Sequence, residues 1–551
     1  MGSLRYKAAP VLLLLLFIIG AVMTGGCSRE LKSQGPQTVA VQLQRGGKIV
    51  YGSLVEPNIA NPMFSDLVAT AEVGAMIFSG LAVMNDKGQW LPDLAAELPT
   101  VKNGGVTPDG LTVTYKLRSG VTWHDGKPFT AEDVKFTWQV IMDGKNPVPS
   151  REGYDRIIGI DTPNNQTVVI RFREVYAPYL TLFPTILPSH ILSGEQEPAK
   201  AAFNRAPVGT GPFRFKDWIL GESITLEANP SYHHRRPMVD EIIYRILPDA
   251  NIMLAQLKAG DLDIVSHVPL SQLEQVKALS GFQTVITPTM IWEHLDFNLT
   301  NPLFQDFRVR QAVTYAIDRQ AIVGGVLKNA ATGATADQGH LSWAYNPSLT
   351  PVVRDVNRSR ELLKQAGWTE GYDGIFGKEG RKLSFTITTT KGNKIRETTA
   401  ALIVQQLQEA GIQAEIRLVD VPVFFGDILK NRRFETALFA WASGLDPDNY
   451  KFWHSREIPS GYNNYGGKNY PGWSNPEVDR LTEQGMKTAD WEVRQQFYYR
   501  LQEFIMEEVP VIPLYYRATV SAVKAGVTNY NPSPAPAGNM WNIWQWGIAK
   551  Q

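Results

Sequence analysis

His124 and Asp125 are neighbouring side chains whose types could do acid–base chemistry, since an imidazole beside a carboxylate can pass a proton. Their surroundings favour a structural role instead. Asp125-Gly126 is typical of a turn, and Thr130 followed three residues later by Asp133 predicts a capped helix N-terminus. The buried stripe of that helix would be formed by Val134, Trp138 and Ile141. We therefore expect a turn and a helix cap here rather than a catalytic pair.

The remaining histidines show no spacing that is typical of a metal site. The chain has eight histidines, and the adjacent His233 and His234 cannot both face one side of a helix. No His-x-x-x-His pair, no Gly-x-Ser-x-Gly elbow and no phosphate-binding glycine loop occurs in the sequence. We therefore predict no catalytic residue, no metal site and no cofactor.

Cys27 is the only cysteine among 551 residues, so it cannot form an intramolecular disulfide. A short basic segment, an apolar run and two glycines precede it: Arg5 and Lys7, residues 11–19, and Gly25-Gly26. This layout predicts an export signal that is too short for a membrane span. A cysteine at this junction resembles the lipoprotein signal, in which the thiol is diacylated and becomes the first mature residue. The alternative is an ordinary secretory signal, because Thr24 stands where lipoprotein signals prefer an aliphatic residue.

The composition excludes some classes of partner. The chain has 54 basic and 54 acidic residues, so its charge is balanced. Nothing in the sequence favours a nucleic-acid partner, which would need a basic stripe. After Met23 no apolar run has the length of a membrane span, and we expect a soluble body behind a polar tether over residues 28–37. The length indicates about two or three domains. The many aromatic residues (14 Trp, 20 Tyr and 23 Phe) suit a large binding cleft as well as a core.

Two stretches predict strand–helix–strand crossovers. In the first, residues 242–247 form a strand, Asp249 caps a helix that Gly260 ends, and residues 262–265 return as a strand. In the second, residues 383–389 and 414–418 alternate as strands around a helix. The apolar face of that helix would contain Ile395, Thr399, Leu402, Leu407 and Ala410. The wide separation favours two α/β lobes over one continuous sheet. Before both crossovers, between residues 80 and 190, residues 111–117 and 167–172 predict antiparallel strands of an inserted α+β domain.

Six segments together resemble the family 5 extracellular solute-binding proteins, the dipeptide-, oligopeptide- and nickel-binding receptors of ABC importers. The densest segment is GVTWHDGKPFTAEDVKFTW at residues 120–138. The others are residues 206–213 (APVGTGPF), 302–319, 441–455, 475–479 (NPEVD) and 510–516 (PVIPLYY). Their order and spacing match from about residue 46 to the end, so the resemblance covers nearly the whole mature chain.

The resemblance implies an α/β, two-lobed periplasmic-binding-protein-like fold of type II, with an additional inserted α+β domain in lobe I. The lobes would close on a ligand about a hinge, and the chain would cross between them near residues 292–295 and 512–516. The expected divisions are 1–26 signal peptide, 27–45 lipidated N-terminus and tether, 46–80 lobe I first part, 81–190 inserted domain, 191–288 lobe I second part, 289–511 lobe II, and 512–551 return crossover and lobe I tail.

The resemblance also implies where a ligand would bind. In the peptide receptors of this family, an aspartate three positions after a tryptophan pairs with the ligand's ammonium group. Trp441 matches that tryptophan, but Gly444 stands three positions on. Asp446 and Asp448 are nearby substitutes, since a buried ammonium needs a carboxylate partner. The alternative is that residues 446–449 only form a turn.

Other site residues follow from the same resemblance. Trp441 would form a cleft wall, and Ala442 and Ser443 would offer backbone groups to an extended peptide. One of Tyr515 and Tyr516 would face the ligand while the other packs inward. Glu56 lies in a loop that would line the cleft, whereas Trp453 and His454 are expected to be a partly buried aromatic and a surface imidazole.

The sequence therefore predicts a lipid-anchored, extracytoplasmic receptor that captures oligopeptides and delivers them to the transmembrane subunits of an ABC permease. We expect it to act as a monomer, held to the membrane through Cys27, and to do no chemistry on its ligand. Receptors of the same fold for cello-oligosaccharides or for nickel or haem chelates remain alternatives. From another class, an exported hydrolase or a membrane-docked sensor remains an alternative.

Overall fold

The structure is a computed structural model that describes residues 43–550. The predicted signal peptide, Cys27 and most of the predicted tether lie outside the described residues. Across the described part of the chain, no helix combines the length and the apolar character that crossing a membrane requires.

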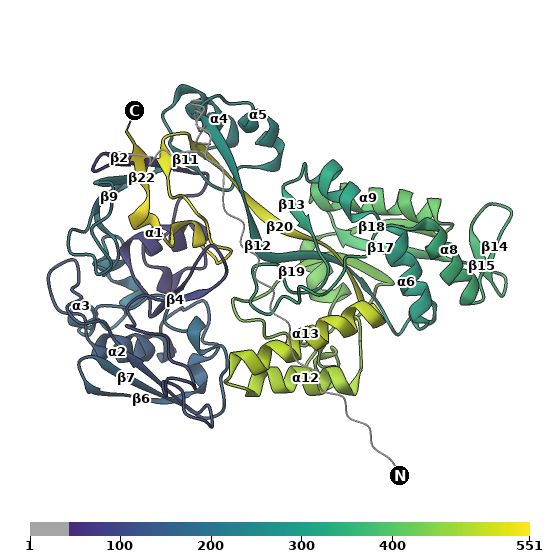
Figure 1. The fold of residues 1–551 in the computed structure, drawn as a ribbon, viewed down its shortest axis with the longest axis horizontal. Helices are drawn as coiled ribbons and strands as arrows, with labels where there is room; N and C mark the ends of the chain where they lie inside the picture. The colour runs from purple at the N-terminus through teal and green to yellow at the C-terminus, as the bar shows by residue number, and fades with distance from the viewer. Residues whose placement is uncertain (1–42, 551) are drawn as a thin grey trace, which may run out of the picture. The chain divides into compact units, whose positions relative to one another are not determined.

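One large sheet of 11 strands connects the described elements (Figure 1). Its order is β18-β17-β19-β12-β20-β11-β2-β10-β9-β8, and β13 pairs with β20 off this path. The bounds are β2 (Lys48–Ser53), β8 (Phe213–Ile219), β9 (Ser223–Ala228), β10 (Glu241–Ile246), β11 (Ile264–Val265), β12 (Phe282–Phe297), β13 (Ala331–Gly333), β17 (Ser384–Thr390), β18 (Gln413–Val419), β19 (Thr436–Ala442) and β20 (Val511–Lys524). We call the elements around β2 and β8–β11 lobe I, and those around β17–β19 lobe II.

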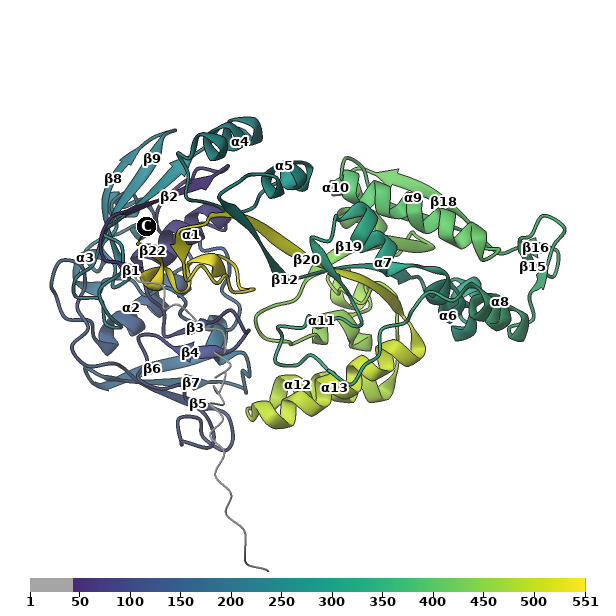
Figure 2. The same ribbon diagram turned by 45° about the horizontal axis from the view of Figure 1, so that its top comes forward.

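The strands β12 and β20 run through both lobes as one antiparallel pair (Figure 2). They contain 16 and 14 residues. Their register shifts between Pro288 and Trp292, where the Thr289 hydroxyl donates to Arg517 O at 3.1 Å. The expectation of two lobes without a continuous sheet is therefore wrong in one respect. Both lobes are present, but these two long strands hydrogen-bond to each other and join the lobes in a single ladder.

The first predicted crossover is confirmed as β10, α4 (Ala250–Ala259) and β11. Both strands pair in parallel with β2, which lies between them. The Asp249 carboxylate accepts hydrogen bonds from the backbone N–H groups of Asn251 and Ile252 and so begins the helix. Gly260 ends the helix with a φ of 79°, a conformation that glycine adopts without steric cost.

The second predicted crossover is confirmed as β17, α9 (Lys394–Glu409) and β18, with the two strands paired in parallel. The predicted buried face of α9 is wrong at its start. Ile395 is 37% exposed, whereas Ala400 and Ile403 are fully buried. The reason is a charged residue in the first turn: Arg396 turns inward and donates to the buried Glu293 carboxylate at 3.1 Å. Hydrophobic periodicity cannot foresee a helix face that begins with a buried ion pair.

Residues 82–172 form two small sheets apart from the large one. β3 (Ala82–Met84) pairs with β4 (Trp90–Pro92), and β5 (Thr112–Lys116), β7 (Thr167–Phe172) and β6 (Ile157–Asn164) form an antiparallel sheet, which confirms the two predicted strands. The helix α2 (Ala131–Met142) packs on this sheet, and Thr130 and Asp133 form the predicted capping box. In the stripe of α2, Val134 and Ile141 are buried and Trp138 is half-buried.

His124 bonds to backbone groups rather than to Asp125. Its Nε2 lies 3.0 Å from Gly211 O, and its Nδ1 accepts a hydrogen bond from Gly209 N–H at 3.2 Å. Burial lowers the pKa of His124 to about 4, so the ring is neutral near pH 7. Asp125 instead faces His190, with 2.7 Å between Oδ2 and Nε2.

The C-terminal tail returns to lobe I. β21 (Val527–Thr528) and β22 (Gly547–Ala549) form a small sheet with β1 (Leu43–Gln44). The Asn539 amide donates at 2.7 Å to the carboxylate of Glu72, on α1 (Val68–Ile77). The hydroxyls of Tyr51 and Tyr244 donate to the same buried carboxylate at 2.9 Å. One satisfied buried acid therefore ties the tail to β2, β10 and α1.

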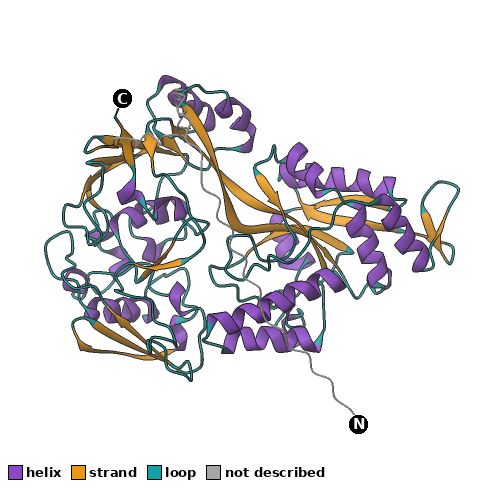
Figure 3. Ribbon diagram, viewed as in Figure 1, coloured by secondary structure: helices purple, strands orange, loops and turns teal. Residues whose placement is uncertain are grey.

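Helices surround the strands of both lobes (Figure 3). The remaining bounds are α3 (Ser189–Leu192), α5 (Leu273–Lys277), α6 (Phe307–Ala316), α7 (Arg319–Ala321), α8 (Val356–Gln365), α10 (Val421–Val423), α11 (Tyr450–Trp453), α12 (Pro476–Lys487), α13 (Trp491–Glu508), and a three-stranded sheet of β14 (Thr369–Glu370), β15 (Phe376–Lys378) and β16 (Arg381–Lys382). Lobe I and lobe II have separate hydrophobic cores, around Tyr51 and Ile242 in the first and around Phe297 and Phe385 in the second.

Candidate ligand-binding site

The end of β19 carries an aromatic wall, formed by Trp441, Phe452 and Tyr470. Trp441 lies opposite Trp292 of β12, and its half-buried ring stacks on Tyr470 with 5.6 Å between centroids. The ring of Phe452 lies 4.9 Å from that of Trp441. The Lys468 ammonium lies 5.2 Å from the Trp441 centroid, within range of a cation–π contact. The expectation that Trp441 forms a cleft wall stays a prediction, and sequence reasoning did not single out Phe452 or Tyr470.

One edge of β19 is free near the wall. β17 pairs with β19 only as far as Leu438, and no other strand among residues 43–550 pairs with that edge. The strand continues to Ala442, which is exposed, and Ser443 N–H then donates to Met290 O at 2.8 Å on the β12 side. Unpaired strand edges bind extended peptides by adding a strand. The backbone around Ala442 and Gly444 can therefore offer hydrogen bonds to a ligand.

Asp446 is already occupied by a cation of the protein. Its carboxylate accepts two hydrogen bonds from Arg494 of α13, at 2.6 and 2.8 Å. The side chains of Arg494 and Asp446 are 3% and 12% exposed. Burial acts to lower the pKa of Arg494, but the Asp446 charge and the hydrogen bonds to Asp446 and Tyr498 outweigh burial. The pKa of Arg494 is therefore raised above its ordinary value. Asp446 thus holds the loop of residues 443–449 against α13.

Asp448 lies two residues further and forms no ion pair within the described residues. Its Oδ1 accepts one hydrogen bond, from Tyr450 N–H at 3.1 Å. Burial raises the pKa of the Asp448 carboxyl, and the Asp446 charge adds to the increase, while the Tyr450 N–H and Arg494 oppose it. A half-buried carboxylate without a cation is the kind of group that gains from a ligand ammonium.

Sequence reasoning missed Asp337, which is buried behind the 443–449 loop. Its Oδ2 accepts hydrogen bonds from Asn449 Nδ2 and Trp453 Nε1, both at 2.9 Å, and its backbone carbonyl accepts one from the Ser443 hydroxyl at 3.1 Å. Burial raises the pKa of Asp337, although these side-chain donors oppose the increase. No local pattern marks this residue, because its partners lie more than 100 positions away.

The structure places Tyr515 and Tyr516 in the interior, with 1% and 2% of their surface exposed. The Tyr516 hydroxyl lies 2.9 Å from Ala336 O and 2.7 Å from Gln338 O. Tyr515 belongs to the lobe II core, and burial raises its pKa above the ordinary range. Both rings therefore pack inside the protein, and the Tyr516 hydroxyl is hydrogen-bonded there.

Glu56 and His454 also have partners inside the protein. Glu56 Oε1 accepts hydrogen bonds from Trp218 Nε1 at 3.0 Å and from Gly221 N–H at 3.1 Å, so it ties the loop after β2 to the β8–β9 hairpin. His454 is buried, which corrects the expectation of a surface imidazole. Its Nδ1 accepts from Arg456 N–H at 3.0 Å, and its Nε2 lies 3.3 Å from Glu483 Oε1.

A cavity of about 600 Å³ lies beside the 443–449 loop. It is lined by lobe I, by the C-terminal tail and by Leu445, with Phe78, Tyr232 and Trp541 among the aromatic residues. A more open hollow of about 980 Å³ lies at the start of α9 and includes no residue of the loop. Of these two hollows, only the first includes a residue of the 443–449 loop, Leu445.

Comparison with known proteins agrees with this architecture. The sequence model for "Bacterial extracellular solute-binding proteins, family 5 Middle" matches residues 89–463. The chain is 30% identical to the oligopeptide-binding protein AppA of Bacillus subtilis (strain 168), over 99% of this chain and 100% of AppA.

Solved structures of similar proteins cover nearly the whole described chain. That of AppA from Bacillus subtilis in complex with a nonapeptide has 30% sequence identity and a TM-score of 0.64, and covers 92% of this chain and 100% of AppA. That of NikZ from Campylobacter jejuni in complex with Ni(L-His) has 26% identity and a TM-score of 0.67, and covers 91% of this chain and 99% of NikZ. The two-lobed fold, the matching family model and the end-to-end likeness to AppA lead to one conclusion: this chain belongs to the family 5 bacterial extracellular solute-binding proteins.

Proposed function

We propose that this protein is the substrate-binding component of an ABC importer and captures oligopeptides between its lobes for delivery to the permease. The observation that carries the peptide assignment is Asp448, a half-buried carboxylate without a cation partner, in the loop that follows the free edge of β19. The first group suits a peptide ammonium, and the second suits a peptide backbone. The likeness to AppA, whose structure contains a nonapeptide, supports the same ligand class.

The aromatic wall and Lys468 would complete the site. Trp441 is half-buried beside Tyr470 and Phe452 and would offer its remaining apolar surface to ligand side chains. Lys468 forms no ion pair within the described residues. Burial lowers the pKa of Lys468, with Lys451 adding to the decrease, so a ligand carboxylate would be a favourable partner. Affinity would come from these contacts and from closure of the lobes about β12 and β20, without chemistry on the ligand.

Mass spectrometry of the ligand that co-purifies with the native protein tests this proposal directly. We expect peptides, and we expect peptide pools to raise the melting temperature while cello-oligosaccharides leave it unchanged. Stabilisation by cello-oligosaccharides or by a nickel chelate alone would overturn the peptide assignment. A nickel chelate is a specific alternative ligand, because the solved structure of the similar protein NikZ is in complex with Ni(L-His).

A receptor also has to be separated from a hydrolase or a sensor. Bound peptide should be recovered intact after long incubation, whereas a hydrolase would release shorter products. Expression of the protein with its permease should restore peptide uptake in a transport-deficient strain, whereas a sensor would bind peptide without restoring uptake. The protein would act as a monomer, anchored through lipid at Cys27 on the outer side of the cell membrane.

A further inference from the structure

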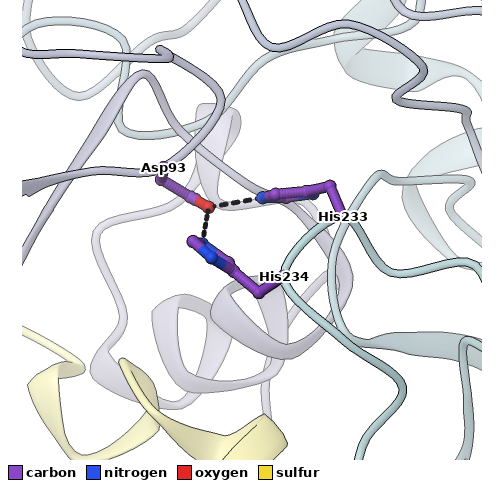
Figure 4. Close-up of side chains that lie close together, drawn as sticks. All are labelled: Asp93, His233 and His234. Carbon is purple, nitrogen blue, oxygen red and sulfur yellow. Dashed lines mark hydrogen bonds and ion pairs between the residues drawn. The ribbon is translucent and has the colours of Figure 1, made fainter.

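Asp93, His233 and His234 converge in lobe I, although 140 residues separate the aspartate from the histidines (Figure 4). His233 Nε2 lies 2.7 Å and His234 Nε2 lies 3.1 Å from the same oxygen, Asp93 Oδ1. Asp93 directly follows β4, and the two histidines stand in the loop between β9 and β10. Two adjacent residues cannot share a helix face, but in this loop both imidazoles point toward one carboxylate. The prediction of no metal site considered the two histidines on a helix and did not consider them in a loop.

Two hydrogen bonds from neighbouring residues fix the position of Asp93. Gly80 N–H donates to Asp93 Oδ2 at 3.3 Å, and Arg118 Nε donates to the Asp93 backbone carbonyl at 2.5 Å. Gly80 itself lies against the backbone of Phe183 and Pro184, where a Cβ atom would stand 2.7 Å from Pro184 O. A glycine is therefore needed at this position, and the second carboxylate oxygen has its own donor. Such outer contacts orient a ligand carboxylate.

The imidazoles are held by aromatic packing and by a turn. The His234 ring stacks on Trp544 with 5.4 Å between centroids and an interplanar angle of 5°. Tyr232 packs against both histidine rings. The buried Asn229 side chain begins the turn by accepting from Ser231 N–H at 3.0 Å. The side chains of His233, His234 and Asp93 are 4%, 24% and 10% exposed, so the group is nearly dry but open on one side.

The three candidate ligand atoms lie within 4.8 Å of one another. Zinc binds imidazole nitrogen and carboxylate oxygen at about 2.0–2.2 Å, and tetrahedral coordination then separates ligand atoms by roughly 3.3 Å. The two nitrogen–oxygen distances, 2.7 and 3.1 Å, would need to open by about 0.6 and 0.2 Å to admit the ion. Asp93 and His234 also line the 600 Å³ cavity, which supplies an entry path and room for a further ligand.

We propose that Asp93, His233 and His234 bind a divalent transition metal ion of the zinc class, with the fourth coordination position directed to the cavity. Two imidazoles and one carboxylate favour zinc or its neighbours over magnesium or calcium, which prefer oxygen-only sites. Three protein ligands with an open position distinguish this arrangement from closed structural zinc sites. None of the three metal ligands belongs to the 443–449 loop, so metal binding and ammonium recognition can be tested by separate variants.

Titration calorimetry of the chelator-treated full protein with zinc chloride tests the proposal. We expect one zinc ion per chain. We expect His233→Gln and His234→Gln each to weaken binding by at least about 100-fold, because loss of even an outer-shell partner costs about 10–100-fold. His190→Gln is the matched control, because His190 also faces a carboxylate, Asp125, but lies outside the group. It should bind zinc like the unmodified protein.

If the histidine variants fail to fold, a spectroscopic measurement on the unmodified protein still tests the metal site. The unmodified protein loaded with cobalt(II) should show the intense visible absorption of a four-coordinate ion rather than the weak bands of an octahedral one. Absence of stoichiometric zinc binding, an octahedral cobalt spectrum, or unchanged affinity in both folded histidine variants would each overturn the metal site. Peptide binding, measured separately on the metal-free protein, distinguishes this failure from failure of the proposed function.

Discussion

Arg494 holds Asp446 through both carboxylate oxygens, and this ion pair fixes the loop between β19 and α11 to α13. The Arg494 guanidinium also donates to Gly485 O at 2.8 Å and lies 5.3 Å from the centroid of Trp343. All three guanidinium nitrogens of Arg494 are thus hydrogen-bonded. Of the two aspartates that sequence reasoning offered as ammonium partners, one is committed to the fold and the other is left without a cation.

The first prediction concerns the stability of this loop. Asp446→Ala should destabilise the protein by about 3–5 kcal/mol, because it leaves the Arg494 charge buried without a partner. Urea unfolding followed by tryptophan fluorescence measures the change. Asp448→Ala is the matched control and should cost less than about 1 kcal/mol, since that carboxylate forms no ion pair. Equal losses for the two variants would contradict the assigned roles.

The second prediction concerns recognition of the ligand ammonium. Asp448→Asn should weaken binding of a peptide with a free amino terminus by at least ~1.5 kcal/mol, as for a lost charge-assisted hydrogen bond. N-acetylation of the peptide should cost the unmodified protein a similar amount. The Asn variant should bind the acetylated and free peptides equally in calorimetry. Equal affinity of the unmodified protein for both peptides would retire Asp448 as the anchor.

The third prediction is a proton effect at the same residue. The pKa of Asp448 is raised above its ordinary 3.8 in the free protein, and a bound ammonium should lower it. In the acidic range between these two pKa values, peptide binding should therefore release a proton, and affinity should fall as the pH falls. Calorimetry in buffers of different ionisation enthalpy measures this release. Proton release should vanish in Asp448→Asn, and its persistence would place the proton elsewhere.

The fourth prediction uses His294, which is buried on β12 with its Nε2 3.4 Å from Asp296 Oδ1. Burial lowers the pKa of His294 to about 3 from an ordinary 6.5, and burial raises that of Asp296, so both are neutral inside the protein. Below pH 6.5 the unfolded chain takes up a proton at His294 that the folded chain does not. This residue's contribution to stability is therefore full above pH 6.5 and is lost as the pH falls toward 3.

Urea unfolding at several pH values checks this effect against His294→Gln. As the pH falls from 6 to 4, the unmodified protein should lose up to about 1.4 kcal/mol per pH unit relative to the variant. The variant controls for Asp296 and for all other titrating groups, because they are present in both proteins. Parallel pH profiles for the two proteins would show that His294 titrates normally in the fold.

The fifth prediction concerns Cys27, which lies outside the described residues. Two acyl chains would hold the protein at the membrane, since each buried methylene contributes about 0.8 kcal/mol. Cys27→Ala should release the protein from membrane fractions and leave its peptide affinity unchanged. Retention of the variant in washed membranes would mean that another feature anchors the protein.

The sequence by itself determined the local elements and the family. The strand–helix–strand units around α4 and α9, the capping box of Thr130 and Asp133 and the end of α4 at Gly260 all depend on neighbouring residues, so spacing alone predicted them. The six matching segments predicted the two-lobed fold before any contact was known. Predicting these features requires no knowledge of contacts between residues that are distant in the sequence.

Only the tertiary structure decided which of the candidate side chains are free. Arg494 occupies Asp446 from 48 positions away, Glu293 turns Arg396 inward, and His233 and His234 meet Asp93 across 140 residues. Charge pairing and burial act through space, and a carboxylate in a turn has the same local sequence whether or not a distant arginine neutralises it. For that reason the sequence left Asp446 and Asp448 equivalent, and the fold separated them.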